Sequence, residues 1–131
     1  MSTVKKFIVV DDDRVNNILC SMIIETVYSD TIITSFTNPK EALAYIEKEY
    51  IIAENGALLF LDINMPVMSG WEFMKVFENL SDSIKQHIRV YIVSSSVDPR
   101  DKAKADANPL IQGFFSKPLD EDIIASVGEW D

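Results

Sequence analysis

The feature that most constrains the fold of this chain is a regular alternation between short apolar runs and longer amphipathic stretches. The short runs occupy residues 4–10, 31–36, 57–61, 90–93 and 112–115. Several of them are continuously apolar, which is typical of strands in a sheet that is covered on both faces. The sequence therefore predicts five strands.

The stretches between these strands have the spacing and the starting residues of helices. In the first of them, Val15, Ile18, Leu19, Met22 and Ile23 recur at helical intervals. The predicted helices span residues 15–28, 39–49, 69–80, 98–107 and 119–130. Strands that alternate with helices in this way predict right-handed crossovers and a parallel sheet with helices on both faces. The expected fold class is α/β.

Length and composition favour one ordinary globular domain. The 131 residues are 47% hydrophobic and 25% charged, and no low-complexity linker interrupts them. We therefore expect a single domain over residues 1–131 without an output domain. The apolar runs are shorter than the roughly 18 residues that a membrane span needs, so we expect a cytoplasmic protein.

The charge balance narrows the class of partner. The net charge is −9, which disfavours binding to nucleic acid or to an anionic membrane surface because phosphates would be repelled. Proteins and cations are the expected partners. The single cysteine, Cys20, lies in an apolar periodic stretch and is interpreted as a structural buried thiol.

Three consecutive acids, Asp11, Asp12 and Asp13, follow the first strand directly in "FIVVDDDRVNN". Two unit charges 4 Å apart repel by roughly 4 kcal/mol at an effective dielectric of about 20, so something should compensate them. One of the acids can start the following helix, since Asp favours the N-cap position and the positive end of the helix dipole. A cap needs only one or two acids.

Other polar residues follow the remaining strands. Asp62 and Asn64 follow the third strand in "LFLDINMP", Lys117 follows the fifth in "FFSKPL", and the fourth ends in three serines, Ser94, Ser95 and Ser96. Ligands of open parallel sheets bind outside the carboxyl ends of the strands. These residues are therefore expected to meet at one edge of the sheet.

This set of residues suits a divalent cation and phosphoryl chemistry. Carboxylates from two neighbouring strands can share a hard cation, and an incomplete oxygen cage favours Mg²⁺ over Ca²⁺. Lys117 and a serine hydroxyl could stabilise the remaining charge of a phosphoryl group. Asp62, alone at the end of its strand, is the best candidate for a covalent acceptor of phosphate.

Together, "VVDDD", "LFLDINMPVMSGWEF", the serines after "VYIV" and "FFSKPL" resemble the receiver domain of two-component response regulators over nearly the whole chain. The resemblance implies a doubly wound, flavodoxin-like (βα)5 fold with strand order 2-1-3-4-5. It also implies that Asp62 is the phosphoacceptor, that Asp11 and Asp12 hold Mg²⁺, and that Lys117 contacts the phosphate. Asn64 then lies where the family supplies a metal ligand through a backbone carbonyl, and Asp13 is interpreted as a helix-starting residue.

The resemblance leaves two candidates for the switch hydroxyl. Aligning the strand "VYIV" points to Ser94, whereas the family's usual distance back from the lysine points to Ser95. Ser94 is preferred because the strand sets the side-chain direction, and because "NPLIQG" is one residue longer than the usual turn.

By the same resemblance, the protein is a signalling phosphoacceptor rather than a conventional enzyme. It would take its phosphoryl group from a phosphohistidine of a sensor histidine kinase or histidine phosphotransfer protein, and catalyse its own phosphotransfer and autodephosphorylation. Phe114 occupies the aromatic switch position, and the face of the fourth helix, fifth strand and fifth helix is expected to change its affinity for a downstream protein.

Two other functions compete with this hypothesis. A phosphatase of the haloacid dehalogenase type also uses a strand-end Asp and Mg²⁺, but it needs a second carboxylate two residues later, where this chain has Asn64. A receiver-like binding module that is never phosphorylated would lack the Asp or the Lys, and both Asp62 and Lys117 are present.

Overall fold

The structure is a computed structural model that describes residues 5–49, 56–95 and 98–127. Its strands are β1 (Lys5–Val10), β2 (Thr31–Phe36), β3 (Ala57–Leu61), β4 (Ile88–Ser94) and β5 (Ile111–Ser116). Its helices are α1 (Arg14–Val27), α2 (Pro39–Glu49), α3 (Gly70–Phe77), α4 (Asp82–His87), α5 (Pro99–Ala107) and α6 (Glu121–Val127). The predicted strand residue Val4, the serine Ser96 and the predicted helix end at Trp130 lie outside the described residues.

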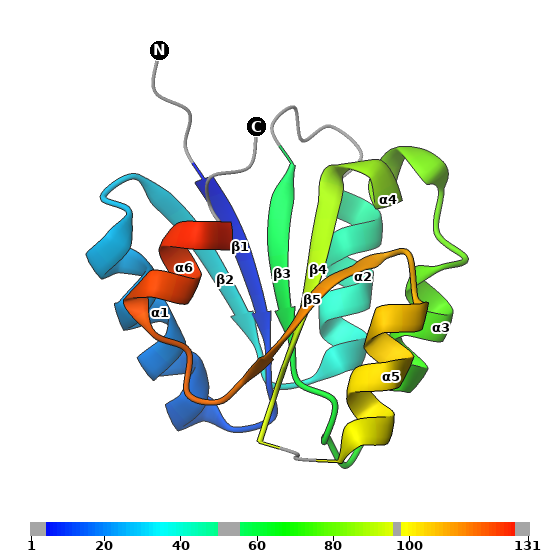
Figure 1. Cartoon of the computed structure of the whole chain (residues 1–131). Coiled ribbons are helices and arrows are strands. Elements are labelled where there is room, and N and C mark those ends of the chain that lie inside the picture. Colours follow the sequence, from blue (N-terminus) through cyan, green and yellow to red (C-terminus); the bar gives the residue numbers. More distant parts are fainter. Residues whose placement is uncertain (1–4, 50–55, 96–97, 128–131) are drawn as a thin grey trace.

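All strand pairs are parallel, and the sheet has the order β2-β1-β3-β4-β5 (Figure 1). Both the α/β class and the 2-1-3-4-5 order are therefore confirmed. In Figure 1 the strands run downward, so that their carboxyl ends meet at the lower edge of the sheet. The short helix α4 was not predicted; among its six residues only Ile84 is buried, so it carries little apolar signal.

The core consists of two apolar layers, one on each face of the sheet. On β1, Ile8 and Val10 face a cluster that includes residues of α2 and α3, whereas Phe7 and Val9 face a cluster that includes residues of α1 and α6. Successive strand side chains point to opposite faces, and both faces are covered, which explains why the strands are continuously apolar. Among the described residues, no helix combines the length and the apolar character that a membrane span requires.

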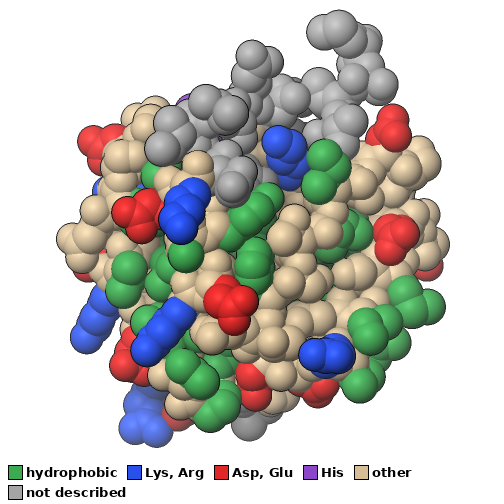
Figure 2. Space-filling model, turned by 180° about the vertical axis from the view of Figure 1, so that it is seen from behind, with side chains coloured by type: hydrophobic (Ala, Val, Ile, Leu, Met, Phe, Trp, Pro, Cys, Tyr) green, Lys and Arg blue, Asp and Glu red, His purple; other side chains and the backbone are tan. Residues whose placement is uncertain are grey.

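Helix α1 presents an unusual apolar surface. Its inner side, including Cys20, Ile23 and Ile24, packs against the sheet and α6. Its outer side carries an apolar stripe that remains exposed, with fractions of 63%, 53%, 50% and 58% for Val15, Ile18, Leu19 and Met22. Figure 2 shows hydrophobic side chains gathered at the lower right, over the region of α1. Helical spacing predicted this helix, but only the packing reveals which apolar side faces solvent.

Candidate functional site

The register of the sheet brings the predicted site residues to one edge. Val10 of β1 is paired with Leu61 of β3, so Asp11 and Asp62 follow neighbouring strand ends. The backbone N–H of Asp62 donates to the carbonyl oxygen of Val10 at 2.9 Å. On the other side, the backbone N–H of Lys117 donates to the carbonyl oxygen of Ser94 at 2.9 Å. The four strand ends thus converge as the sequence predicted.

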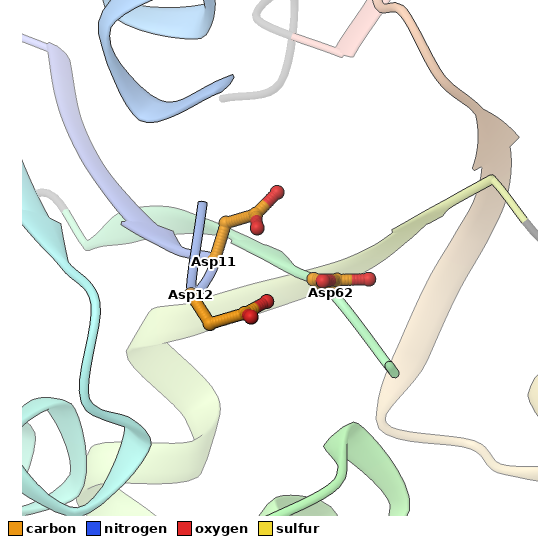
Figure 3. A group of neighbouring side chains, drawn as sticks. All are labelled: Asp11, Asp12 and Asp62. Carbon is orange, nitrogen blue, oxygen red and sulfur yellow. The ribbon is translucent and has the colours of Figure 1, made fainter. Parts of the chain in front are cut away.

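Three carboxylates form the centre of the site. One carboxylate oxygen from each of Asp11, Asp12 and Asp62 lies within 4.8 Å of the other two, and the three side chains approach one another (Figure 3). Asp11 and Asp62 are buried, whereas Asp12 is exposed. The group of three acids therefore lies at the protein surface, with Asp11 and Asp62 on its buried side and Asp12 on its solvent side.

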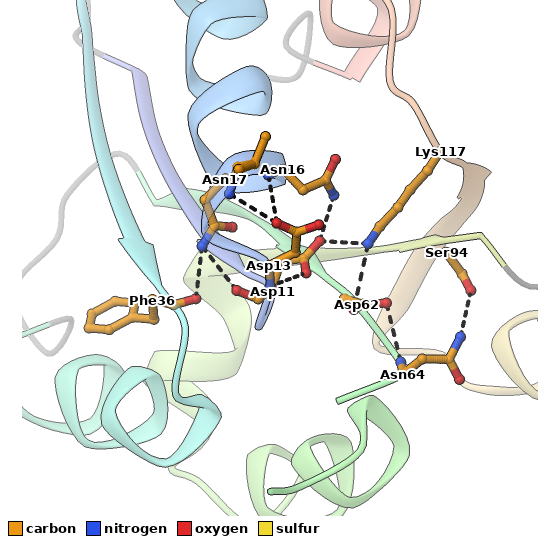
Figure 4. Close-up of polar contacts among 10 residues, drawn as sticks. Asp11, Asp13, Asn16, Asn17, Phe36, Asp62, Asn64, Ser94 and Lys117 are labelled. Atoms are coloured by element: carbon orange, nitrogen blue, oxygen red, sulfur yellow. Dashed lines mark hydrogen bonds and ion pairs between the residues drawn. The ribbon is translucent and has the colours of Figure 1, made fainter. Parts of the chain in front are cut away.

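Asp11 is fixed by several donors (Figure 4). The backbone N–H of Asp13 donates to its Oδ1 at 2.9 Å, and the Asn16 amide donates to its Oδ2 at 2.6 Å. Burial disfavours its charge, but the hydrogen bonds from Lys117, Asp13 and Asn16 outweigh that effect and lower the pKa of Asp11. Asp11 is therefore an ionised and immobilised carboxylate.

Lys117 links two of the acids. Its Nζ lies 2.6 Å from Asp11 Oδ2 and 3.5 Å from Asp62 Oδ2 (Figure 4). Burial disfavours the ammonium, but the hydrogen bonds and attraction of Asp11 and Asp62 prevail and raise the pKa of Lys117. The Lys117 ammonium therefore offsets part of the negative charge of the three carboxylates at this edge.

The negative charge of Asp62 is less well compensated than that of Asp11. Burial, and then the charge of Asp11, raise its pKa to about 6, although the Asn64 backbone N–H and Lys117 oppose the rise. That N–H donates to Asp62 Oδ1 at 3.2 Å. A group of hard oxygen donors with an excess of negative charge fits a divalent cation such as Mg²⁺. The chemistry of the donor set is therefore compatible with the metal site that the sequence predicted.

Asp13 has a separate role. Its side chain accepts hydrogen bonds from the backbone N–H groups of Val15 and Asn16 at 3.0 and 3.4 Å, which makes it the N-cap of α1. The interpretation of Asp13 as a helix-starting residue is confirmed. Its backbone N–H nevertheless contributes to the site through Asp11.

The two candidate switch serines lie in different environments. Ser94, at the end of β4, is 0% exposed, and its hydroxyl lies 3.5 Å from the Asn64 amide nitrogen. Ser95 is exposed in the bend that follows. The side chain of Phe114 on β5 is partly buried against the cluster that contains α2 and α3 residues. The switch roles of Ser94, Ser95 and Phe114 and the carbonyl ligand of Asn64 stay predictions.

Sequence reasoning did not identify two residues that shape the site. Asn16, which holds Asp11, lies in the first turn of α1 and could have been inferred from its position five residues after that acid. Gly70 begins α3, and a Cβ there would lie 2.7 Å from Ile63 Cα and 2.8 Å from the Asp62 carbonyl oxygen. Because Gly70 has no side chain, α3 can approach the backbone of Asp62 this closely.

A small cavity lies behind the acids, between α1 and the connection from β5 to α6. Its volume is about 30 Å³, and Asp11, Asp62 and Lys117 line it together with apolar side chains and Cys20. Burial raises the pKa of the Cys20 thiol to about 12, which keeps the thiol protonated and unreactive. Cys20 is only partly buried, which differs from the predicted buried thiol, but its packing against the apolar cluster of α1 and α6 agrees with a structural role.

Comparisons with known proteins agree with this geometry. The chain is similar to a two component response regulator from Cytophaga hutchinsonii, with 30% identity, a TM-score of 0.87, and coverage of 98% of this chain and 96% of that one. A response regulator receiver protein from Dyadobacter fermentans, at 24% identity, supports the fold alone, with a TM-score of 0.86 and coverage of 95% and 94%.

Among curated proteins, the transcriptional regulatory protein FlgR of Helicobacter pylori is 32% identical over 95 residues, which are 72% of this chain. The match spans only 21% of the length of FlgR. The family model described as the response regulator receiver domain matches residues 7–127. The chain therefore belongs to the response regulator receiver domain family of two-component systems.

Proposed function

We propose that Asp62 accepts a phosphoryl group from a phosphohistidine in a reaction that depends on Mg²⁺. The observation that carries this proposal is the convergence of Asp11, Asp12 and Asp62 with Lys117 at one sheet edge. Phosphoryl transfer asks a protein mainly for positioning and for stabilisation of charge, and this edge supplies both.

Asp12 and Asp62 are the proposed direct carboxylate ligands, with the Asn64 carbonyl as a further one. Both oxygens of Asp11 already accept hydrogen bonds from protein donors, so Asp11 serves mainly to orient Lys117 and to add negative charge. When bound, Mg²⁺ would neutralise the carboxylates and the phosphoryl oxygens during transfer.

In the proposed reaction, a carboxylate oxygen of Asp62 attacks phosphorus in line with the imidazole nitrogen of the donor. The new O–P bond forms as the N–P bond breaks, and the imidazole leaves with the electron pair of that bond. The Lys117 ammonium, 3.5 Å from Asp62 before the reaction, is close enough to pair with an oxygen of the new phosphoryl group. Attack of water on phosphorus would later release phosphate and restore the carboxylate.

Ser94 is the proposed switch hydroxyl, because it is buried at the strand end beside Asn64 whereas Ser95 is exposed. Its movement toward the phosphoryl group would bias the face formed by α5, β5 and α6, on which Phe114 is the proposed aromatic switch. A downstream protein that binds this face would sense the phosphorylation state.

The exposed apolar stripe of α1 supports the proposal that the phosphodonor binds this protein through a helix. Val15, Ile18, Leu19 and Met22 are spaced as one helix face, and α1 begins directly after the acids. Apolar side chains at such spacing pack well against another helix. A sensor histidine kinase or a phosphotransfer protein with a helix-borne phosphohistidine could therefore dock on α1 and present its phosphoryl group to Asp62.

The cytoplasmic location and the single-domain organisation stay predictions.

Beryllofluoride, which mimics a phosphoryl group on a carboxylate, tests this function. We expect bound fluorine signals in ¹⁹F NMR spectra only when Mg²⁺ is present, and none for Asp62→Asn. Asp13→Asn is the matched control, because Asn caps helices as well as Asp does and the change removes a neighbouring charge outside the three-carboxylate group. Binding that persists in Asp62→Asn, or that ignores Mg²⁺, would refute the proposal.

A further inference from the structure

Helix α5 buries few of its side chains. Of its nine residues, Ala105 alone is buried and Asp101 is half-buried, while the others are exposed. By contrast, α2 buries Ala42, Leu43 and Ile46. Helices are held in place mainly by their buried apolar face, so any additional contact of α5 carries unusual weight.

Trp71 of α3 provides that additional contact. Its indole Nε1 donates a hydrogen bond to Asp101 Oδ1 of α5 at 3.2 Å. The ammonium of Lys104, also on α5, lies 5.5 Å from the centre of the same ring, within the range of a cation–π interaction. We call Trp71, Asp101 and Lys104 the clasp.

Each half of the clasp is connected to the acid site by a different route. Trp71 follows Gly70, whose backbone N–H donates to the Ile63 carbonyl oxygen at 3.0 Å and which has no room for a side chain against Asp62 and Ile63. Trp71 is therefore fixed relative to the backbone of Asp62. Helix α5, in contrast, begins five residues after Ser94 in the chain.

Movement at Ser94 would consequently change the geometry of the clasp. If the Ser94 hydroxyl leaves Asn64 for a phosphoryl group on Asp62, we expect α5, which follows Ser94 closely in the chain, to shift while Trp71 stays in place. We propose that the clasp holds α5 in its resting position, and that Trp71 is a positioning residue that sets how strongly the unphosphorylated state is favoured. This inference rests on the proposed function, because it assumes that Asp62 carries the phosphoryl group.

Thermodynamic linkage gives the expected result. An interaction present only in the resting state opposes any ligand that favours the switched state, and its removal must strengthen that ligand. Loss of one hydrogen bond should therefore increase the affinity for beryllofluoride with Mg²⁺ by about threefold to tenfold. The same loss should accelerate amide hydrogen exchange in residues 100–107 by a similar factor, even without beryllofluoride.

Four variants separate the clasp from other effects. Asp101→Ala removes the acceptor, and Trp71→Phe removes the N–H donor but keeps an aromatic ring. Asp101→Asn removes the charge from the first turn of α5 but keeps an acceptor oxygen. Asp106→Ala is the matched control, since Asp106 is a carboxylate on α5 that pairs with Lys102 of the same helix at 3.2 Å.

The inference is supported if Asp101→Ala and Trp71→Phe both accelerate exchange in α5 and tighten beryllofluoride binding, while Asp101→Asn and Asp106→Ala resemble the parent protein. Unchanged exchange in the first two variants would overturn the clasp. Faster exchange with unchanged or weaker binding would overturn its link to the site. An Asp101→Asn variant that behaves like Asp101→Ala would overturn the clasp, because the charge of Asp101 and not its hydrogen bond to Trp71 would then hold α5. Absence of any ¹⁹F adduct in the parent protein would instead refute the proposed function, while the exchange measurement without beryllofluoride would still test how α5 is held.

Discussion

The substitution Asp62→Asn should stabilise the metal-free protein, although it destroys the proposed phosphoacceptor. Two unit negative charges at 4.8 Å repel by about 3 kcal/mol at an effective dielectric of about 20, and Asp62 has two carboxylate neighbours with an oxygen within that distance. Lys117 offsets part of that repulsion. Burial, together with the remaining repulsion, raises the pKa of Asp62 from 3.8 to about 6.

The size and the sign of the effect follow from this pKa. The rise corresponds to about 3 kcal/mol between the ionised and protonated forms, and water at the open edge should reduce this to about 2 kcal/mol. Because the folded state holds this proton more tightly than the unfolded chain does, folding stability falls as the pH rises from about 4 to about 6. The full penalty is present above about pH 7.

Urea unfolding in the presence of a chelator measures this penalty. We expect Asp62→Asn to raise the free energy of unfolding by about 2 kcal/mol at about pH 7.5 and by about half as much at about pH 5. Asp82→Asn, which removes an exposed acid, should change stability by less than about 0.5 kcal/mol at either pH. A gain that is absent at neutral pH, or that is equal at the two pH values, would refute the electrostatic reasoning.

Three further substitutions test other parts of the site. Gly70→Ala should lower the free energy of unfolding in urea by about 1–3 kcal/mol, because its Cβ would meet backbone atoms of Asp62 and Ile63. Gly113→Ala should lower it by less, because its Cβ would meet the Tyr91 ring at 3.2 Å. Lys117→Met should lower the stability of the metal-free protein at neutral pH by about 2 kcal/mol, because it leaves Asp11 buried without its cation, and added Mg²⁺ should restore part of the loss. An unchanged free energy of unfolding in the presence of a chelator would contradict this. Ile18→Glu should slow phosphotransfer from a phosphohistidine protein by about tenfold and leave phosphorylation by acetyl phosphate unchanged, whereas Val76→Glu on α3 should slow neither reaction. Equal losses with both donors would argue against docking on α1.

The strands and the location of the site could be predicted because both depend on local sequence. A continuously apolar run indicates a strand covered on both faces, and the carboxyl ends of parallel strands share one edge. Asp11, Asp62 and Lys117 could therefore be assigned to one site before their distances were known. The helix-starting role of Asp13 likewise follows from local capping chemistry.

Other features depend on packing between distant segments and could not be predicted. Helix α1 has apolar residues on two sides, so its periodicity does not reveal that Ile24 is buried and Ile18 is exposed. The hydrogen bond between Trp71 and Asp101 joins residues 30 positions apart that share no motif. The sequence left Ser94 and Ser95 as alternatives, and the burial of Ser94 at the end of β4 is what supports its proposed role.

Direct phosphorylation by acetyl phosphate tests the central claim most directly. Borohydride reduction followed by peptide mass spectrometry would identify the acyl phosphate by its residue. We predict one modified residue, Asp62, whose labelling requires Mg²⁺ and stops when a chelator is added. Labelling of another residue, or labelling of Asp62 that proceeds equally well without Mg²⁺, would contradict the account.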